Sequence, residues 1–181
     1  MIYLFLADGF EDTEAIAALD VLRRAGLDAK TVGVTGNTVK SSHGVTVATD
    51  ISAEEAVMDE SVDAIILPGG IPGTPNLENS DVVQDAITYC AEHDKYLCAI
   101  CAAPSILGHR GILEGKRAIC YPGWEKDLTG AVVTKQPVVI DGKVITSNGA
   151  GSALLFGEAI AAQFVGAEAA HEVLLTMQYS F

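Results

Sequence analysis

Basic residues are scarce in this chain of 181 residues. It contains 11 lysines and arginines against 24 aspartates and glutamates, which gives a formal net charge of -13. A surface this acidic repels the phosphate backbone of a nucleic acid. It also offers no cationic face to anionic lipids. We therefore expect neither a nucleic acid nor a membrane as a partner.

Long apolar segments and a targeting segment are missing as well. No apolar run reaches the length of a membrane span before a charged residue interrupts it. The apolar start, Met1 to Ala7, lacks the basic residues that open a signal peptide and runs directly into Asp8, so it predicts a first strand. The 4 cysteines in such a chain suggest free thiols in a reducing cytosol. We expect a cytoplasmic protein.

Three patterns that would announce a cofactor or a metal are incomplete. Cys98 and Cys101 form one C-x-x-C motif, but there is no second pair for zinc. A thioredoxin-like role is disfavoured because Cys98 falls inside a predicted strand, whose period of two points it away from Cys101. The glycines at 69–70 are not followed by the Gly-Lys-Ser/Thr of a phosphate-binding loop, and residues 148–153 lack the third glycine of a dinucleotide loop. We therefore expect no cofactor and no metal.

Predicted strands alternate with predicted helices along the chain, which favours a single α/β domain, residues 1–181, with a mostly parallel sheet. The predicted strands cover 2–7, 29–34, 63–67, 97–101, 117–120, 132–133, 138–140 and 144–146, with a hairpin over 39–49. The predicted helices cover 11–25, 53–58, 81–93, 152–164 and 167–177, with a further helix after Cys101. In open α/β sheets the site lies beyond the carboxyl ends of the strands, so Asp8, Gly69, Gly70 and Cys101 should converge.

The most informative stretch covers residues 95–107, where an apolar strand ends at Cys101 and a helix follows at once. Pro104 suits the first turn of that helix, where a missing N–H costs nothing. The thiol of Cys101 would meet unpaired N–H groups and the positive end of the helix dipole, and both favour the thiolate. Such a turn displays a nucleophile. The alternative is a buried cysteine that packs as a small apolar residue.

Glu14 lies in the first turns of the predicted helix over 11–25. If its carboxyl group were buried beside Cys101, it would keep its proton and donate it to the sulfur. The alternative is that Glu11, Asp12 and Glu14 are solvated and only complement the helix dipole.

Backbone N–H groups could stabilise an intermediate formed at Cys101. The two glycines of Leu67-Pro68-Gly69-Gly70 let the backbone approach a ligand closely. Together with the N–H of Ala102, they could form an oxyanion hole. The alternative is a plain turn between a strand and a loop.

A histidine base is required in a Cys-dependent hydrolase. Of the 4 histidines, only His43, on the predicted hairpin, is expected near the site. The others fall near helix ends or inside the last helix. Tyr121 stands where the strand after Cys101 ends.

These motifs resemble those of the DJ-1 family, within the DJ-1/ThiJ/PfpI superfamily, over nearly the whole chain. The matching segments, in order, are Ala7-Asp8-Gly9-Phe10-Glu11-Asp12-Thr13-Glu14, Asp20-Val21-Leu22-Arg23-Arg24-Ala25-Gly26, Leu67-Pro68-Gly69-Gly70, Ala99-Ile100-Cys101-Ala102-Ala103-Pro104 and Thr146-Ser147-Asn148-Gly149-Ala150-Gly151. Five motifs in order are specific for the family and much less specific for an activity.

The resemblance implies a flavodoxin-like three-layer sandwich of the class I glutamine amidotransferase-like kind, which forms a homodimer. It implies that Cys101 is an oxidation-sensitive thiolate, that Glu14 is its protonated partner, and that Gly70 and Ala102 supply N–H groups. Arg24 would approach the pocket from the second copy of the chain.

The resemblance also implies an activity on small reactive carbonyl compounds, of the glyoxalase or deglycase type and without a cofactor. An alternative is an oxidative-stress sensor or redox-regulated chaperone that uses the same cysteine. A cysteine peptidase or amidase and a nucleotide-binding module are further alternatives. Ala102 stands where the peptidase pattern requires a histidine, which disfavours a peptidase. Tyr121 and His43 stand where some members carry a histidine and an arginine, and either residue could be an accessory group.

Overall fold

A seven-stranded sheet forms the centre of the molecule. A computed structural model of the chain describes residues 1–180, so the predicted domain, residues 1–181, extends one residue beyond the described part. The spatial order of the strands is β10 (Val138–Asp141), β11 (Val144–Ser147), β7 (Tyr96–Ile100), β6 (Ala64–Leu67), β1 (Ile2–Leu6), β2 (Ala29–Gly33) and β5 (Ile51–Ser52). Neighbouring strands are parallel except β10 and β11, which form the predicted hairpin around residues 141–142.

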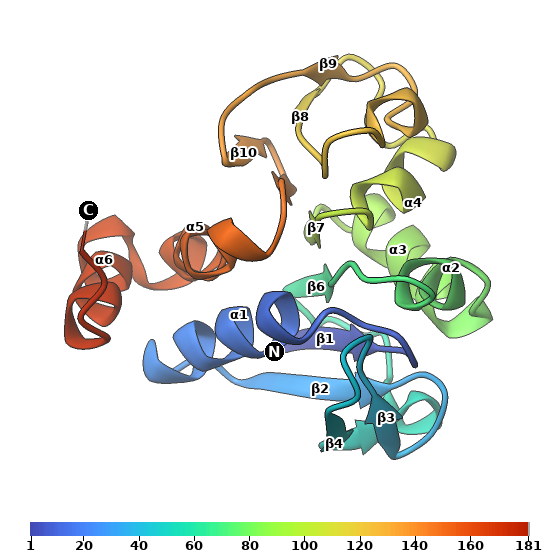
Figure 1. The fold of residues 1–181 in the computed structure, drawn as a ribbon, viewed down its shortest axis with the longest axis horizontal. Helices are drawn as coiled ribbons and strands as arrows, with labels where there is room; N and C mark the ends of the chain where they lie inside the picture. The colour runs from blue at the N-terminus through green and yellow to red at the C-terminus, as the bar shows by residue number, and fades with distance from the viewer. Residues whose placement is uncertain (181) are drawn as a thin grey trace.

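Helices cover both faces of this sheet (Figure 1). One face carries α1 (Asp12–Arg24), α5 (Ala153–Val165) and α6 (Ala167–Thr176), and the other carries α2 (Gly73–Glu78), α3 (Asp81–Glu92) and α4 (Pro104–His109). Strand residues alternate between the two cores: Leu4 packs toward α1, whereas Phe5 packs toward α3. Strands buried on both faces are typical of parallel sheets. The predicted α/β fold with a mostly parallel central sheet is confirmed.

Several local predictions are wrong in detail. The helix α2 was not predicted, because Pro72, Gly73 and Pro75 suggest a loop; Pro75 falls in the first turn of the helix, where a proline is tolerated. The predicted helix over 53–58 is only the 3-10 turn Ala53–Glu55. The predicted strand over 117–120 shortens to β8 (Arg117–Ala118), which pairs with β9 (Val132–Val133) outside the main sheet.

The remaining elements lie at the edges of the fold. The predicted hairpin over 39–49 is present as β3 (Thr38–Lys40) and β4 (Thr46–Ala48), a separate antiparallel pair. Two further 3-10 turns, Glu125–Asp127 and Ala150–Ser152, lie in loops. Within residues 1–180, none of the helices combines the length and the apolar character needed to cross a bilayer.

The helices α1 and α5 pack unusually close together at Gly157. A β-carbon on Gly157 would lie only 2.9 Å from Cβ of Val21 and 3.1 Å from Cα of Ala18. Glycine at this position lets the backbone of α5 rest on α1, the helix that carries Glu14. The position of Glu14 therefore depends on a contact that the same face of its helix makes one and two turns further along.

Gly157→Leu should destabilise the fold. The larger side chain has no space between the two helices, and such overpacking costs about 1–3 kcal/mol of unfolding free energy. Urea denaturation followed by circular dichroism measures this cost. Gly151→Leu is the matched control, because a β-carbon there meets no atom within 4 Å. An equal loss in both variants would contradict the proposed role of the close helix contact.

Candidate active site

Cys101 lies on a sharp turn between β7 and α4. Its φ angle is 64°, in the left-handed region that residues other than glycine rarely adopt. Two backbone hydrogen bonds hold this turn: the N–H of Cys101 donates to the carbonyl of Ser147 (2.9 Å), and the N–H of Tyr121 donates to the carbonyl of Cys101 (2.8 Å). The predicted turn from strand to helix is therefore present, and it leaves the thiol half-buried.

Glu14 is almost completely buried, although it lies in the first turn of α1. Its side chain is only 1% exposed, and its Oε2 accepts a hydrogen bond of 2.9 Å from the N–H of Gly69. Glu11 caps the same helix by accepting a bond of 2.8 Å from the N–H of Glu14. Glu11 and Asp12 thus complement the helix dipole from partly exposed positions, as the alternative interpretation expects, but Glu14 does not.

The thiol and the buried carboxyl group meet beside Gly69. A β-carbon on Gly69 would lie 2.7 Å from Oε2 of Glu14, 2.6 Å from Cβ of Cys101 and 3.0 Å from its sulfur. No larger residue fits there without moving one of the two side chains. The sequence predicts that Gly69 offers its N–H to a ligand, whereas the structure uses this N–H for Glu14. The Gly-Gly pair in the sequence was the signal that could have revealed this role, because each of its two glycines makes a different contact in the site.

The pKa of Glu14 is raised to about 7, and burial is the largest cause. The hydrogen bonds from the side chain of Cys101 and from the N–H groups of Gly69 and Ala150 lower this pKa, whereas the charge of Glu11 raises it. The donors thus offset only part of the cost of burying the charged carboxylate. Glu14 can hold or release a proton near neutral pH.

The pKa of Cys101 is raised, first by burial and then by the charge of Glu14 and its hydrogen bond. The N–H groups of Ala102 and Gly70 lower it, as the sequence predicts, but they do not prevail. The predicted net lowering by the turn and the helix end is therefore wrong, because a short local motif does not report burial or the charge of Glu14. A proton on Glu14 removes that charge, so the thiolate is favoured only together with the protonated carboxyl group.

The backbone at Gly70 also requires a glycine. Its φ angle is 97°, and a β-carbon would lie 2.4 Å from the carbonyl oxygen of Gly9. This conformation allows the N–H of Gly70 to act on the sulfur of Cys101 together with the N–H of Ala102. Both predicted donors therefore lie at the thiol.

A surface hollow of about 440 Å³ lies on the outer side of the loop that carries Gly149 and Ala150. Tyr121 and Asn148 line it together with residues 149–152. At Gly149, a β-carbon would lie 3.4 Å from the ring of Tyr121 and 3.8 Å from Oε1 of Glu14. Gly149 thus lies between Glu14 and the ring of Tyr121, which is 51% exposed.

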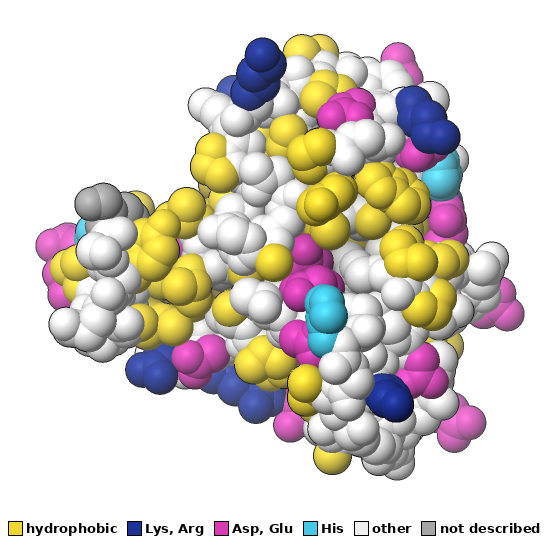
Figure 2. All heavy atoms as spheres, viewed as in Figure 1, with side chains coloured by type: hydrophobic (Ala, Val, Ile, Leu, Met, Phe, Trp, Pro, Cys, Tyr) yellow, Lys and Arg dark blue, Asp and Glu magenta, His cyan; other side chains and the backbone are white. Residues whose placement is uncertain are grey.

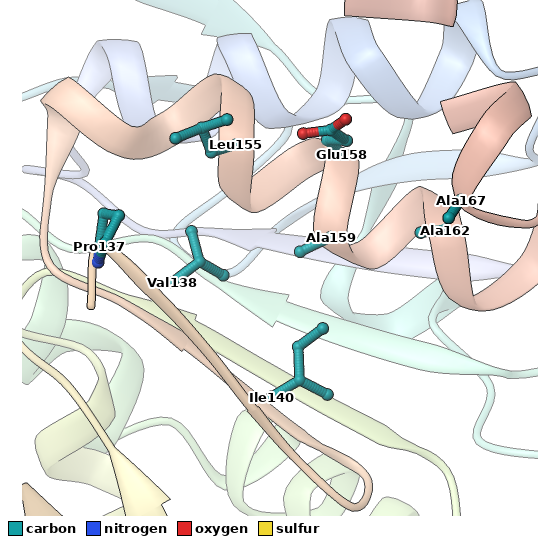
Figure 3. A pocket seen from close by; sticks show the side chains of 8 residues that line it. All are labelled: Pro137, Val138, Ile140, Leu155, Glu158, Ala159, Ala162 and Ala167. Atoms are coloured by element: carbon teal, nitrogen blue, oxygen red, sulfur yellow. The ribbon is translucent and has the colours of Figure 1, made fainter. Parts of the chain in front are cut away.

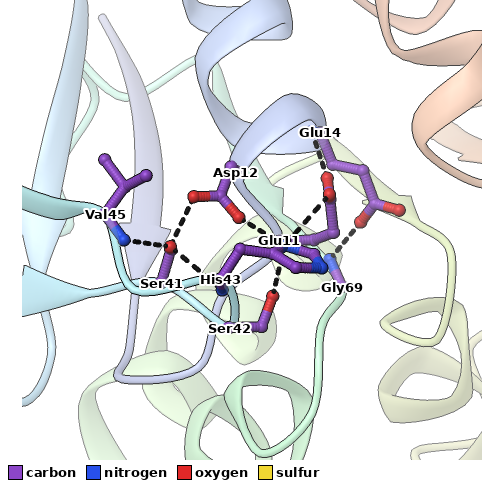
Figure 4. A network of polar contacts seen from close by, with 8 residues as sticks. All are labelled: Glu11, Asp12, Glu14, Ser41, Ser42, His43, Val45 and Gly69. Carbon is purple, nitrogen blue, oxygen red and sulfur yellow. Dashed lines mark hydrogen bonds and ion pairs between the residues drawn. The ribbon is translucent and has the colours of Figure 1, made fainter.

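His43 belongs to a polar network at the exposed N-terminal end of α1 (Figure 4). Its Nδ1 lies 2.7 Å from Oδ2 of Asp12 and 3.9 Å from Oε1 of Glu11, and its side chain is 70% exposed. The pKa of His43 is raised by its hydrogen bond to Asp12. Figure 4 shows Glu11 between this network and Glu14. A direct role of His43 in the site stays a prediction.

Among residues 1–180, one group of side chains, Glu11, Asp12 and His43, has the donor set of a metal site. Their ligand atoms lie within 4.8 Å of one another. The second oxygen of Asp12 is hydrogen-bonded to Ser41, and Glu11 is engaged with the N–H of Glu14. The three side chains thus already use their hydrogen-bonding groups for one another and for the N-terminal end of α1.

Two residues of the predicted constellation lie elsewhere in the single chain. The carboxylate of Asp8 accepts a bond of 2.8 Å from the N–H of Lys40 and so anchors the β3–β4 hairpin. Arg24 pairs with Asp20 at 2.8 Å near the end of α1, about 15 Å along the helix from Glu14. Arg24 can reach the pocket only from a second copy of the chain, and the homodimer stays a prediction.

The other cysteines are free and belong to the core. Cys90, Cys98 and Cys120 are at most 1% exposed. Cys98 lies in the core beneath α1, and Cys101 packs against that same core. The predicted opposite orientation of these two residues is wrong, because the left-handed backbone at Cys101 ends the alternation of the strand.

The fold and the site together define an α/β protein with a cysteine on a strand-to-helix turn beside a buried glutamate. The family model of the DJ-1/PfpI family matches residues 1–163. The chain belongs to this family, as the motifs in its sequence predict.

Relatives of known name support this assignment. Protein dj-1beta of Drosophila melanogaster is 36% identical over 173 residues, which cover 94% of this chain and 92% of the relative. A deglycase of Pyrococcus abyssi is 33% identical over 148 residues, which cover 81% of this chain and 88% of the deglycase. Protein DJ-1 homolog B of Arabidopsis thaliana is 36% identical over 171 residues; these cover 93% of this chain but only 39% of that longer protein.

The fold agrees with solved structures. Oxidised DJ-1 of Toxoplasma gondii superimposes with a TM-score of 0.94 at 28% identity, over 99% of this chain and 98% of that one.

Glu14→Gln should change the pH dependence of stability. The pKa of about 7 in the folded chain exceeds the ordinary value of 4.5. The native state therefore gains stability from this group below pH 4.5 and loses it as the pH rises through 7. The two pKa values correspond to a loss of the order of 3 kcal/mol. Urea denaturation at pH 4.5 and pH 8 should show this loss in the wild type relative to Glu14→Gln.

Glu172→Gln, at an exposed position of α6, is the control for this measurement. It should follow the wild type at both pH values. Parallel stability curves for the wild type and Glu14→Gln would contradict a raised pKa of the buried carboxyl group.

Proposed function

We propose that this chain is a cofactor-independent enzyme that converts small reactive carbonyl compounds, with Cys101 as nucleophile and Glu14 as proton carrier. One observation carries the proposal: a half-buried thiol and a buried carboxyl group with a pKa of about 7 converge beside Gly69. Groups that exchange protons at working pH suit general acid–base catalysis. The similarity to a deglycase supports the same class of chemistry.

The first step is the addition of the thiol to an aldehyde. The sulfur of Cys101 forms a bond to the carbonyl carbon, and the electron pair of the C=O bond moves to the oxygen. The thiol proton passes to that oxygen by way of Glu14, so the product is a neutral hemithioacetal. We assign the stabilisation of the developing oxyanion to the N–H groups of Gly70 and Ala102, which act on the sulfur in the free chain.

The second step applies when a second carbonyl group adjoins the first, as in methylglyoxal. The carboxylate of Glu14 removes the hydrogen of the hemithioacetal carbon as a proton, and the electron pair of that C–H bond moves onto the neighbouring carbonyl group, which gives an enediolate with its charge on the neighbouring oxygen. Glu14 returns the proton to the neighbouring carbon. The hydroxyl proton on the carbon bound to sulfur passes to the neighbouring oxygen, so that the first carbon becomes a thioester and the second carries a hydroxyl group. Water hydrolyses the thioester to lactate and restores the thiol. The balance is one methylglyoxal and one water for each lactic acid.

The surroundings of the pair favour small substrates. The hollow beside Tyr121 has a volume of about 440 Å³, and Gly149 in its lining lies next to Glu14. The polar groups that act at the sulfur are a carboxyl group and two backbone N–H groups, in place of the imidazole that a Cys–His peptidase requires. A small dicarbonyl compound meets these limits better than a peptide.

Cys101→Ser should abolish lactate formation from methylglyoxal in the absence of glutathione, because a hydroxyl is a weaker nucleophile than a thiol. Glu14→Gln should lower kcat by about 100-fold or more, because glutamine cannot carry a proton. An enzymatic assay of D- and L-lactate measures both rates. Cys120→Ala, in the core and outside the site, should retain the wild-type rate. Rates in the wild type no higher than in Cys101→Ser would refute the proposed enzyme.

A second candidate function is oxidation sensing at the same thiol. Cys101 is the one half-buried cysteine, whereas Cys90, Cys98 and Cys120 are buried. Two molecules of hydrogen peroxide would convert its thiol to a sulfinic acid and release two molecules of water. The N–H groups of Gly70 and Ala102 and a protonated Glu14 can then donate to the sulfinate oxygens. The similarity to an oxidised DJ-1 structure fits this chemistry.

Mild peroxide should add two oxygen atoms to Cys101 before it modifies any other cysteine. Cys90 and Cys120 are at most 1% exposed, so peroxide reaches their sulfur atoms less readily than the half-buried sulfur of Cys101. Mass spectrometry of tryptic peptides locates the added mass, and Cys101→Ala supplies the control. Earlier oxidation of Cys90 or Cys120 would refute this candidate function.

A further inference from the structure

A second cavity lies at the opposite end of the sheet from Cys101. It has a volume of about 550 Å³ and is lined by the end of α3, the first residues of β7 and β11, and the loop that precedes β8. Leu97 in its wall and Cys101 lie four residues apart along β7, which corresponds to about 13 Å of strand. The cavity is therefore separate from the proposed active site.

The cavity is rich in positive charge. Lys95, Lys116 and Lys143 line it, so three of the 11 basic residues of an acidic chain gather here. All three are half-buried, and the side chains of Lys95 and Lys143 are 22% and 39% exposed. Partial burial of an ammonium group costs free energy unless an anion or hydrogen-bond acceptors compensate. The ammonium group of Lys143 lies over the ring of Tyr96, which packs with α5 on the other face of the sheet. Lys95 and Lys116 are therefore the two lysines that favour an anionic ligand in this cavity.

The acidic residues nearby leave these ammonium groups largely available. Nζ of Lys143 lies 3.8 Å from Asp94, which is 85% exposed, and Nζ of Lys95 lies 3.8 Å from Asp63. Charge-assisted hydrogen bonds measure about 2.7–2.9 Å. Both of these contacts are longer, so neither lysine forms a charge-assisted hydrogen bond with its aspartate. Within residues 1–180, Lys116 has no carboxylate oxygen within 4.0 Å of its Nζ.

The other contacts of the lysines hold them in place. Lys95 donates to the carbonyl oxygen of Glu60 at 3.2 Å, and Nζ of Lys143 stacks 4.2 Å from the centre of the Tyr96 ring. Lys116 lowers the pKa of Asp141, but this carboxylate is already bound by the backbone N–H of Arg117 at 3.0 Å. A lysine has three N–H donors, so each retains capacity for a ligand.

Apart from Asp94, which is exposed, the rest of the wall is mostly apolar. Leu97 and Val144 are 2% and 3% exposed, and Ile112 is half-buried. An apolar wall with a few converging polar groups, at a volume of about 300–1,000 Å³, is typical of small-molecule sites. The lysines alone would suit any anion, whereas the apolar wall favours one with an apolar body.

We propose that this cavity binds a small amphiphilic anion, in which a carboxylate or phosphate head group contacts Lys95 and Lys116 and a short apolar chain lies against Leu97, Ile112 and Val144. The site is independent of the chemistry at Cys101. It would let an acidic protein bind an anion on a face remote from its reactive thiol.

Isothermal titration calorimetry with hexanoate, hexyl phosphate and hexan-1-ol tests the proposal. At least one of the two anions should bind saturably with a stoichiometry of one per chain. The tighter anion identifies the head group. Hexan-1-ol has the same chain without the charge and should bind at least tenfold more weakly. Cys101→Ala should bind the anion as the wild type does.

Lys116→Met should weaken binding of the anion at least fivefold, and Lys116→Arg should restore most of it. Lys126→Met removes an exposed charge outside the cavity and is the matched control. Ala91→Phe, at the rim, should block the anion without changing any charge. Circular dichroism verifies that each variant is folded.

Four results would overturn the proposal: no saturable binding of either anion, equal binding of hexan-1-ol, an equal loss in Lys126→Met, or loss of binding in Cys101→Ala. The last result would place the anion at the proposed active site instead.

Discussion

The burial of one carboxyl group is the constraint on which the site depends. Glu14 is 1% exposed and cannot remain there without hydrogen-bond donors. The N–H groups of Gly69 and Ala150 and the thiol of Cys101 supply them. These donors follow β6, β11 and β7, so three loops must meet at the first turn of α1. The free-energy cost of burying the charged carboxylate exceeds the stabilisation that these donors provide. The pKa of Glu14 is therefore raised.

The parallel sheet makes this meeting of loops possible. Because β1, β6, β7 and β11 run in the same direction, the segments that follow them emerge at one edge. Two glycines then remove the remaining steric obstacles. Gly69 leaves room for the thiol and the carboxyl group, and Gly70 adopts a left-handed backbone against Gly9. The left-handed turn at Cys101 directs its thiol into the same space.

The chemistry of the Cys101–Glu14 pair depends on which of the two groups carries a proton. A charged Glu14 raises the pKa of the thiol, and a protonated Glu14 can donate to a thiolate. Nucleophilic attack by the sulfur and its oxidation both require the thiolate, which is present when Glu14 is protonated. The same geometry therefore supports both candidate functions, and the reactant decides between them. Carbonyl compounds add to the sulfur, and peroxide oxidises it.

The sequence by itself determined the order of strands and helices, the turn at Cys101 and the membership of the DJ-1/PfpI family. These features reside in short-range patterns: hydrophobic periodicity, Pro104 after the turn, and glycines after strands. The helix α2 escaped prediction because its prolines and glycine also suit a loop. Only the tertiary structure decided the burial of Glu14, the raised pKa of Cys101, the steric role of Gly69 and the gathering of three lysines. Each of these depends on distances between residues far apart in the chain, and on the exclusion of water from the space between them, which local patterns do not encode.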